Sequence, residues 1–311
     1  MGFAMKISVI GAGNVGGTAA MRIAQERLGD VVLVDIAEGL AKGKAADIND
    51  AGNVLGYDCR VEGSGDISAV NGSDIVVFTA GLARKPGMTR EDLLNKNAAI
   101  LKEACLKIKD AAPGAVLIIV TNPLDLMTAL ALRLTGFSRG RVFGMGMTLD
   151  ASRFANILSE MAGAPVSSIG ACVIGSHGEG MIPLPRFTTV NGKPLSASMD
   201  ADAVEEAVRR TVGRGQEIVS YFGNGSAYIA PSAAICDLVK AVAMDSRRIR
   251  GVSFMLEGEY GLRGMCIGVP CRIGRSGVQE VIELELDAAE SGKLRASAEG
   301  LKKLFSALCA V

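Results

Sequence analysis

The sequence predicts an α/β protein in which a doubly wound parallel sheet is followed by a mixed α+β domain. In the first half, continuous apolar runs alternate with helical patterns, and such runs are typical of strands buried on both faces of a parallel sheet. In the second half the strand patterns are shorter, and the pair Asn191-Gly192 favours an antiparallel hairpin. We place the boundary near residue 145, giving domains at 1–145 and 146–311 that pack together without a flexible linker.

Apolar and helical periodicity defines the expected elements in order. Strands are expected in the first half at 6–10, 31–35, 74–79, 115–120 and 141–144. Helices are expected between them at about 15–28, 40–51 and 90–110. The second half is expected to hold helices at 149–161, 201–222, 231–244 and 288–308. Its strands are expected at 168–174, 251–256, 265–270 and 280–286, with the hairpin starting at 188–190.

Composition excludes several classes of function. Among 311 residues, 33 Lys and Arg balance 33 Asp and Glu, so no excess positive charge is available to attract nucleic acid or an anionic membrane. The longest apolar run, 115–120, is far shorter than the roughly 20 residues of a membrane span. Seven scattered cysteines and a single histidine do not form a zinc motif, so no metal site is expected. Reduced thiols of this kind favour a cytoplasmic location.

A glycine-rich motif directly follows the first expected strand and opens the first helix. It has the spacing G-x-G-x-x-G and reads Gly11-Ala12-Gly13-Asn14-Val15-Gly16. Gly11 permits a tight turn, Gly13 lets a pyrophosphate approach the backbone, and Gly16 allows close helix–strand packing. The free N–H groups at the helix N-terminus then favour the phosphates. The motif predicts a Rossmann-type dinucleotide-binding domain, and the alternative is a plain strand–turn–helix connection.

Asp35 supports the cofactor prediction. It ends the second expected strand, about 20 residues beyond the last glycine of the motif, where a carboxylate accepts hydrogen bonds from the adenosine ribose. The carboxylate also repels a 2′-phosphate, and the following residues, Ile36 and Ala37, offer no arginine to bind one. We therefore predict NAD rather than NADP. The alternative role for Asp35 is helix capping.

His177 is the candidate acid–base residue because it is the only histidine in the chain. Imidazole has an ordinary pKa of about 6.5, which suits reversible proton transfer near neutral pH. The neighbouring Gly175 and Gly178 are typical of a turn that lets another group approach closely. A lone histidine is also commonly a surface residue or a hydrogen-bonded core residue, and that alternative stays open here.

Five further polar residues follow strand ends or share a helix face. Arg84 and Arg90 belong to a loop after the strand at 74–79, where open α/β sheets bind ligands. Asn122 follows the next strand, and Asp150 and Arg153 are spaced i, i+3 on one helix face. Their ordinary structural roles would be a solvated basic loop, a helix N-cap and a surface salt bridge.

Taken together, the motifs resemble the lactate/malate dehydrogenase family over nearly the whole chain. The resemblance rests on GAGNVG, LVDI, TAG, RKPGMTREDLL, VTNPLD, MTLDASR, SHGEGMIPLP and GVPCRIGRSGV, which occur in the family order. Two positions depart from the family pattern: Ser176 replaces the more usual glycine or glutamate, and Glu179 replaces an aspartate. The resemblance implies an NAD-binding domain at 1–145, a catalytic domain at 146–311, and a homodimer or homotetramer.

The resemblance also implies a role for each candidate residue. His177 would donate and accept the proton, and Asp150 would hold its second ring nitrogen. Arg153 would bind the C1 carboxylate of the substrate through its planar fork. The remaining expected contacts are Arg90 and Asn122 at the reacting oxygen, Val120, Thr121 and Asn122 at the nicotinamide, and Asn97 at the cofactor.

Arg84 is expected to select the substrate. The family's lactate enzymes usually carry glutamine at this position, six residues before the loop arginine at Arg90. A second enclosed arginine lacks a partner beside the methyl group of pyruvate, but it pairs with the distal carboxylate of oxaloacetate. The sequence therefore predicts oxaloacetate and malate as substrates. The alternatives are a lactate-type dehydrogenase, a metal-dependent NAD glycosidase of related fold, and a non-catalytic NAD-binding module.

Overall fold

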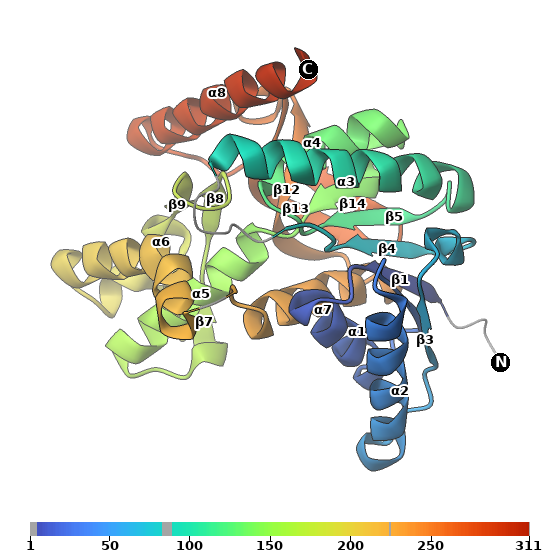
Figure 1. The fold of residues 1–311 in the computed structure, drawn as a ribbon. Helices are drawn as coiled ribbons and strands as arrows, with labels where there is room; N and C mark the ends of the chain where they lie inside the picture. Colours follow the sequence, from blue (N-terminus) through green and yellow to red (C-terminus); the bar gives the residue numbers. More distant parts are fainter. Residues whose placement is uncertain (1–4, 83–88, 224, 311) are drawn as a thin grey trace.

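The computed structural model describes residues 5–82, 89–223 and 225–310. Within them, an eleven-stranded sheet runs through both halves of the chain, with helices on each side (Figure 1). The strands follow the order β3-β2-β1-β4-β5-β6-β12-β13-β8-β9, with β14 paired to β13. A small sheet of order β11-β10-β7 lies in the second half. None of the helices in these segments is long and apolar enough to cross a bilayer.

The first half forms the predicted doubly wound parallel sheet. Its parallel strands are β1 (Lys6–Ile10), β2 (Asp30–Val34), β3 (Val61–Ser64), β4 (Ile75–Phe78), β5 (Val116–Ile119) and β6 (Val142–Gly144). Its helices are α1 (Asn14–Gln25), α2 (Glu38–Leu55), α3 (Arg90–Ala111) and α4 (Leu124–Thr135). The predicted α/β fold class is confirmed. β3 was not predicted, because Glu62-Gly63-Ser64 supplies no apolar run to mark a strand.

The second half is a mixed α+β region with antiparallel pairing. Its helices are α5 (Met147–Ala162), α6 (Ala201–Phe222), α7 (Ile229–Ala243) and α8 (Ala288–Ala310). Its strands are β7 (Ile169–Gly170), β8 (Val173–Gly175), β9 (Met181–Pro183), β10 (Thr189–Val190), β11 (Lys193–Pro194), β12 (Arg248–Glu257), β13 (Arg263–Gly274) and β14 (Gly277–Val281). Short 3-10 helices lie at Ile67–Val70, Arg139–Arg141, Val166–Ser168, Pro185–Phe187, Leu195–Ala197 and Glu259–Gly261. The predicted hairpin at Asn191-Gly192 is confirmed as β10–β11.

Two predicted strands were wrong in extent. The single strand expected at 168–174 is two strands, since β7 pairs with β10 in the small sheet and β8 pairs with β9 and β13 in the large one. The strand expected at 280–286 ends at Val281 as β14. Beyond Val281 the chain bonds to Tyr260 and not to a neighbouring strand. The hydroxyl of Tyr260 accepts a hydrogen bond from Leu284 N at 3.0 Å, and its backbone N–H donates to the Glu283 carboxylate. Apolar periodicity alone does not reveal such changes of partner.

Alternate residues of the parallel strands point to opposite faces of the sheet, and each face has its own core. Ile75 and Val77 of β4 lie in one cluster with α1 and α7, whereas Val76 and Phe78 lie in the other with α3 and α4. All four side chains are fully buried. Burial on both faces explains why the strand reads as a continuous apolar run.

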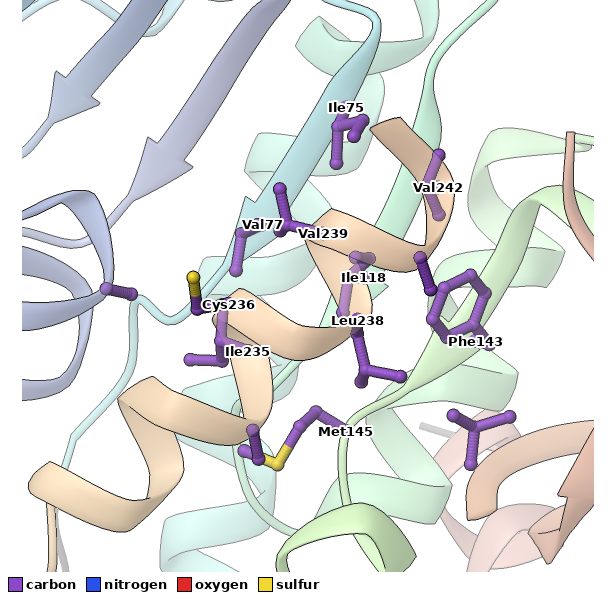
Figure 2. Packing of buried hydrophobic residues seen from close by; sticks show 14 of the residues in the cluster. Ile75, Val77, Ile118, Phe143, Met145, Ile235, Cys236, Leu238, Val239 and Val242 are labelled. Carbon is purple, nitrogen blue, oxygen red and sulfur yellow. The ribbon is translucent and has the colours of Figure 1, made fainter. Parts of the chain in front are cut away.

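The helix α7 links the two halves of the chain. Figure 2 shows its Ile235, Leu238, Val239 and Val242 packed among side chains of the first-half strands. At the same junction β6 pairs with β12 through Gly144 and Ser253, so the sheet continues past residue 145. One hydrophobic core and one sheet therefore cross the domain boundary that the sequence predicts near residue 145. The division into two domains stays a prediction.

We expect Leu238→Ala to lower the free energy of unfolding by about 2–5 kcal/mol, because the side chain is fully buried and its loss leaves a cavity under the sheet. Urea denaturation measures the change. Leu106→Ala is the matched control, since Leu106 is 52% exposed and its truncation should cost no more than about 0.5 kcal/mol. Equal losses in the two variants would contradict the assignment of α7 to this core.

Candidate active site

The glycine-rich turn between β1 and α1 has no room for side chains at two of its glycines. Gly11 has a φ of +103°, and a Cβ there would lie 2.7 Å from Oγ1 of Thr79. A Cβ on Gly16 would lie 1.9 Å from the carbonyl oxygen of Gly11. The first and last glycines of the motif are thus required for the turn itself and for the close packing of α1 on it.

Gly13 differs from the other two glycines because the space beside it is open. It is the N-cap residue of α1, and a Cβ placed on it would have no described atom within 4 Å. No side chain caps the helix at this position, so the first N–H groups of α1 remain available to a ligand. Ala12 is buried, Asn14 is exposed and Val15 is half-buried. This arrangement fits a pyrophosphate at the positive end of α1.

Asp35 is held in place beside the turn. Its Oδ2 accepts a hydrogen bond from the backbone N–H of Ala12 at 2.7 Å, and its Oδ1 accepts one from Ala37 at 2.9 Å. The carboxylate is thereby fixed next to the glycine motif, although the two segments are 23 residues apart. The neighbouring Ile36 is fully exposed. These residues fit the adenosine end of NAD.

The residues predicted near the nicotinamide lie at the carboxyl end of β5. Thr121 donates from Oγ1 to the carbonyl of Ala80 at 2.7 Å, and Asn122 is exposed. Asn97 is only 1% exposed, and its amide bridges two loops. It donates to the carbonyl of Asn122 at 2.8 Å and accepts from the backbone N–H of Leu82 at 2.8 Å. Asn97 therefore fixes the segments around the site, and its expected contact with the cofactor stays a prediction, as does that of Val120.

His177 and Asp150 form a close pair in the second half of the chain. Nδ1 of His177 lies 2.7 Å from Oδ2 of Asp150, whose side chain is completely buried. His177 lies on the loop between β8 and β9, and Gly175 and Gly178 on either side have positive φ of +94° and +110°. The loop needs these glycines to turn the imidazole toward α5.

The electrostatic surroundings favour a protonated imidazole. Burial is the largest single influence and lowers the pKa of His177. The charge of Asp150, its hydrogen bond and the smaller contribution of Asp125 together raise the pKa by more than this. The net result is a pKa above the ordinary value of 6.5. A nearby carboxylate that accepts from Nδ1 also leaves Nε2 as the nitrogen available for proton exchange.

Arg153 adds a cation to the pair. Its Nη1 lies 3.3 Å from Oδ1 of Asp150, and its side chain is 12% exposed. Its pKa is lowered by burial and by repulsion from Arg214 of α6, while Asp150 opposes the shift. Nε of Arg153 and Nη2 of Arg214 are buried without a hydrogen-bond partner within the described residues. A guanidinium in this state is suited to bind an incoming carboxylate.

Several residues around the cluster were not identified from the sequence. Asp125 of α4 accepts a hydrogen bond from the backbone N–H of His177 at 2.9 Å, and Ser253 donates to Asp125 at 2.6 Å. Ser297 of α8 accepts from the backbone N–H of Ser176 at 3.3 Å. These contacts join positions 52 to 128 residues apart, so no local spacing marks them. The only available signal was the aspartate within VTNPLD.

Two predicted residues lie outside this description. Arg84 falls outside the described residues, and Arg90 begins α3 with a side chain that is also outside them.

Among the described residues, no group of three His, Cys, Asp or Glu side chains is placed to hold a metal ion. The six cysteines whose side chains the structure describes are free thiols.

A phosphate-binding turn on a doubly wound sheet, together with a buried imidazole–carboxylate–guanidinium cluster, is typical of nicotinamide-dependent dehydrogenases. Sequence comparison agrees with this class. The family description "lactate/malate dehydrogenase, NAD binding domain" matches residues 5–144. The description "lactate/malate dehydrogenase, alpha/beta C-terminal domain" matches residues 147–310. The chain belongs to the lactate/malate dehydrogenase family and is an NAD-dependent enzyme.

Individual relatives align over nearly the full length. The malate dehydrogenase of Methanosarcina barkeri is 47% identical, covering 97% of this chain and 99% of that protein. The crystal structure of Cryptosporidium parvum malate dehydrogenase has a TM-score of 0.96 at 35% identity, covering 99% of this chain and 100% of the other. The lactate dehydrogenase of the same organism, complexed with lactic acid and NAD, also has a TM-score of 0.96, at 34% identity and full coverage of both chains.

We expect Gly13→Ala and Gly16→Ala to separate cofactor binding from folding. A methyl group at Gly13 meets no described atom but enters the space beside the N-terminus of α1, so NADH affinity should fall roughly tenfold while Tm stays unchanged. A methyl group at Gly16 collides with the Gly11 carbonyl, so Tm itself should fall. Fluorescence titration with NADH and thermal denaturation measure the two effects. Parental affinity in Gly13→Ala would contradict the pyrophosphate position.

Proposed function

We propose that this protein is a malate dehydrogenase that catalyses the reversible NAD-dependent oxidation of (S)-malate to oxaloacetate. The observation that carries the proposed 2-hydroxy acid chemistry is the buried cluster of His177, Asp150 and Arg153, which combines a proton carrier with a carboxylate-binding cation. The names of the curated relatives support the substrate: several that are 44–47% identical over nearly the full length are malate dehydrogenases.

In this reaction His177 transfers the hydroxyl proton. During malate oxidation neutral Nε2 accepts the proton from the C2 hydroxyl, and during oxaloacetate reduction protonated Nε2 returns it. NAD, when bound, accepts the hydride from C2. Asp150 keeps the imidazole in the tautomer with hydrogen on Nδ1 and stabilises the imidazolium that forms. The short Nδ1–Oδ2 distance of 2.7 Å supports this division of roles.

The remaining polar residues bind and orient the substrate. Arg153 binds the C1 carboxylate, for which a planar guanidinium offers two parallel hydrogen bonds. Arg90 polarises the reacting carbonyl, and Asn122 at the end of β5 donates to the same oxygen. Asn97, Val120 and Thr121 form the surroundings of the nicotinamide. We expect the loop around Arg84–Arg90 to close over the substrate and to expel water, which would strengthen each charged contact.

Arg84 is the residue that separates malate from lactate in this proposal. The fold cannot make this distinction, since malate and lactate dehydrogenases from one organism share a TM-score of 0.96 with this chain. An enclosed guanidinium is stabilised by the distal carboxylate of oxaloacetate and stays unpaired beside the methyl of pyruvate. A site built for a charged group can discriminate by about 10⁴ against a substrate that lacks it.

We further propose a homodimer or homotetramer in the cytoplasm, with α2 and α6 in the contacts between subunits. Exposed apolar side chains on these two helices support the choice. Val54 of α2 is 84% exposed, and Tyr221 and Phe222 of α6 are 77% and 49% exposed. Apart from NAD and the small-molecule substrate, the proposal involves no nucleic acid and no membrane.

Steady-state turnover tests the substrate directly. We expect the parent protein to reduce oxaloacetate far faster than pyruvate, and with NADH rather than NADPH. Arg84→Gln should lower kcat/KM for oxaloacetate by about 10³-fold or more and raise it for pyruvate, because the distal carboxylate loses its ion pair. Lys193→Gln, which removes a charge from the exposed strand β11, is the control. A ratio that barely changes in Arg84→Gln would refute the assignment of malate.

A second variant tests the proton carrier. We expect His177→Asn to bind NADH as tightly as the parent but to lose about 10²–10⁴-fold in kcat, because the amide cannot exchange a proton near neutral pH. Stopped-flow binding and the absorbance of NADH at 340 nm measure the two quantities. Turnover close to that of the parent would exclude His177 from the reaction.

A further inference from the structure

Asp125 is a buried carboxylate that the proposed reaction does not use. It lies in the first turn of α4, three residues beyond Asn122, and it is 3% exposed. Its Oδ2 accepts a hydrogen bond from the backbone N–H of His177 at 2.9 Å. Its Oδ1 accepts one from the Ser253 hydroxyl of β12 at 2.6 Å. One side chain thus connects the end of the parallel sheet, the His177 loop and the antiparallel half.

The backbone of the loop that carries His177 is also held next to the histidine, since the N–H of Met181 donates to the Gly178 carbonyl at 3.2 Å. Gly175 and Gly178, with φ of +94° and +110°, allow the chain many conformations on both sides of the histidine. On the preceding residue, the backbone N–H of Ser176 donates to Ser297 of α8 at a longer 3.3 Å. The short bond to Asp125 is therefore the contact that fixes the backbone at His177 itself.

A neutral acceptor could form the same bond to the His177 backbone, so the charge of Asp125 needs a separate explanation. Burying an ionised carboxylate costs free energy. Buried carboxylates in proteins are therefore usually paired with a cation or stabilise a nearby positive charge. Burial raises the pKa of Asp125 to about 6, against the opposing hydrogen bonds of Ser253 and the His177 backbone. At neutral pH most Asp125 side chains are still ionised.

We propose that Asp125 is a positioning residue for His177, which fixes the backbone of the histidine loop and supplies a second negative charge to the His177–Asp150 pair. The effect on turnover rests on the proposed function. The effect on the pKa of the imidazole is independent of it.

The charged and titratable groups around the imidazole set the direction of the effect. Asp150 of α5 and Asp125 of α4 favour the imidazolium, whereas Arg153 of α5 opposes it. Cys266 of β13 also faces Asp125, and its thiol stays neutral because burial and Asp125 raise its pKa. Removing the charge of Asp125 therefore lowers the pKa of His177. The rate of oxaloacetate reduction depends on the protonated imidazole. As pH rises, this rate should therefore begin to fall at a lower pH in the variant than in the parent protein.

Two substitutions separate the positional and electrostatic contributions. Asp125→Asn keeps an oxygen for the His177 backbone and an amide that can donate to Ser253, but it carries no charge. Asp125→Ala removes both the bonds and the charge. Asp202→Asn is the matched control, because it removes the same charge from an exposed position on α6. Thermal denaturation of each variant separates misfolding from local effects.

The single histidine allows a direct measurement without substrate. In protein labelled with ¹³C-histidine, the NMR titration of one imidazole reports His177 alone. We expect its midpoint to fall by roughly one pH unit in Asp125→Asn and to stay at the parental value in Asp202→Asn. The pH profile of kcat/KM for oxaloacetate should shift in the same direction. An unchanged NMR midpoint in folded Asp125→Asn would overturn the electrostatic part of the proposal.

Turnover tests the positional part. We expect kcat of Asp125→Ala to fall about 10²-fold while the Kd for NADH is unchanged, because a displaced imidazole affects the chemical step and not cofactor binding. Asp125→Asn should recover most of this loss at its own pH optimum. A folded Asp125→Ala variant with the parental kcat would overturn the positional part. Failure of the parent to reduce oxaloacetate would instead refute the proposed function, and the NMR shift would still test Asp125.

Discussion

The contact between His177 and Asp150 is the interaction on which the proposed chemistry depends. At 2.7 Å, with the carboxylate completely buried, it determines which imidazole nitrogen is free and keeps the pKa of the ring above its ordinary value. Burial opposes the charged form, so the imidazolium persists because Asp150 is close, with a smaller contribution from Asp125. Arg153 contacts the same carboxylate, with its Nη1 3.3 Å from Oδ1 of Asp150. In the proposed reaction, proton transfer and substrate binding are therefore coupled through Asp150.

A continuous sheet connects this cluster to the strand ends of the first half. Gly144 of β6 pairs with Ser253 of β12, so the last parallel strand continues directly into the antiparallel half. The same Ser253 donates to Asp125, which in turn accepts from the backbone of His177. The histidine is thus tied to the sheet edge that carries Asn122. Rigid support of this kind is what hydride transfer requires, since small displacements of the reacting groups are costly.

The sequence predicted those features whose information is local. The glycine motif and Asp35 depend on short spacings within one strand–turn–helix–strand unit, and the structure brings them together through the Ala12–Asp35 hydrogen bond. The pair Asp150–Arg153 follows from helical spacing. The contacts of Asp125 could not be predicted, because its partner Ser253 lies 128 residues away. For the same reason the strand at 168–174 was not resolved into β7 and β8, whose partners lie in different sheets.

Substrate choice is the step that neither fold nor cluster determines. In the proposed reaction His177, Asp150 and Arg153 act on the 2-hydroxy acid unit, which malate and lactate share. One fold accommodates both kinds of enzyme. The difference between the two acids is one carboxylate at the far end of the molecule. A charge at that end must be matched by a charge on the protein, because an unpaired ion in a closed site is strongly unfavourable. In the proposed function this charge is that of Arg84, so the choice between the two acids depends on one guanidinium and not on the fold.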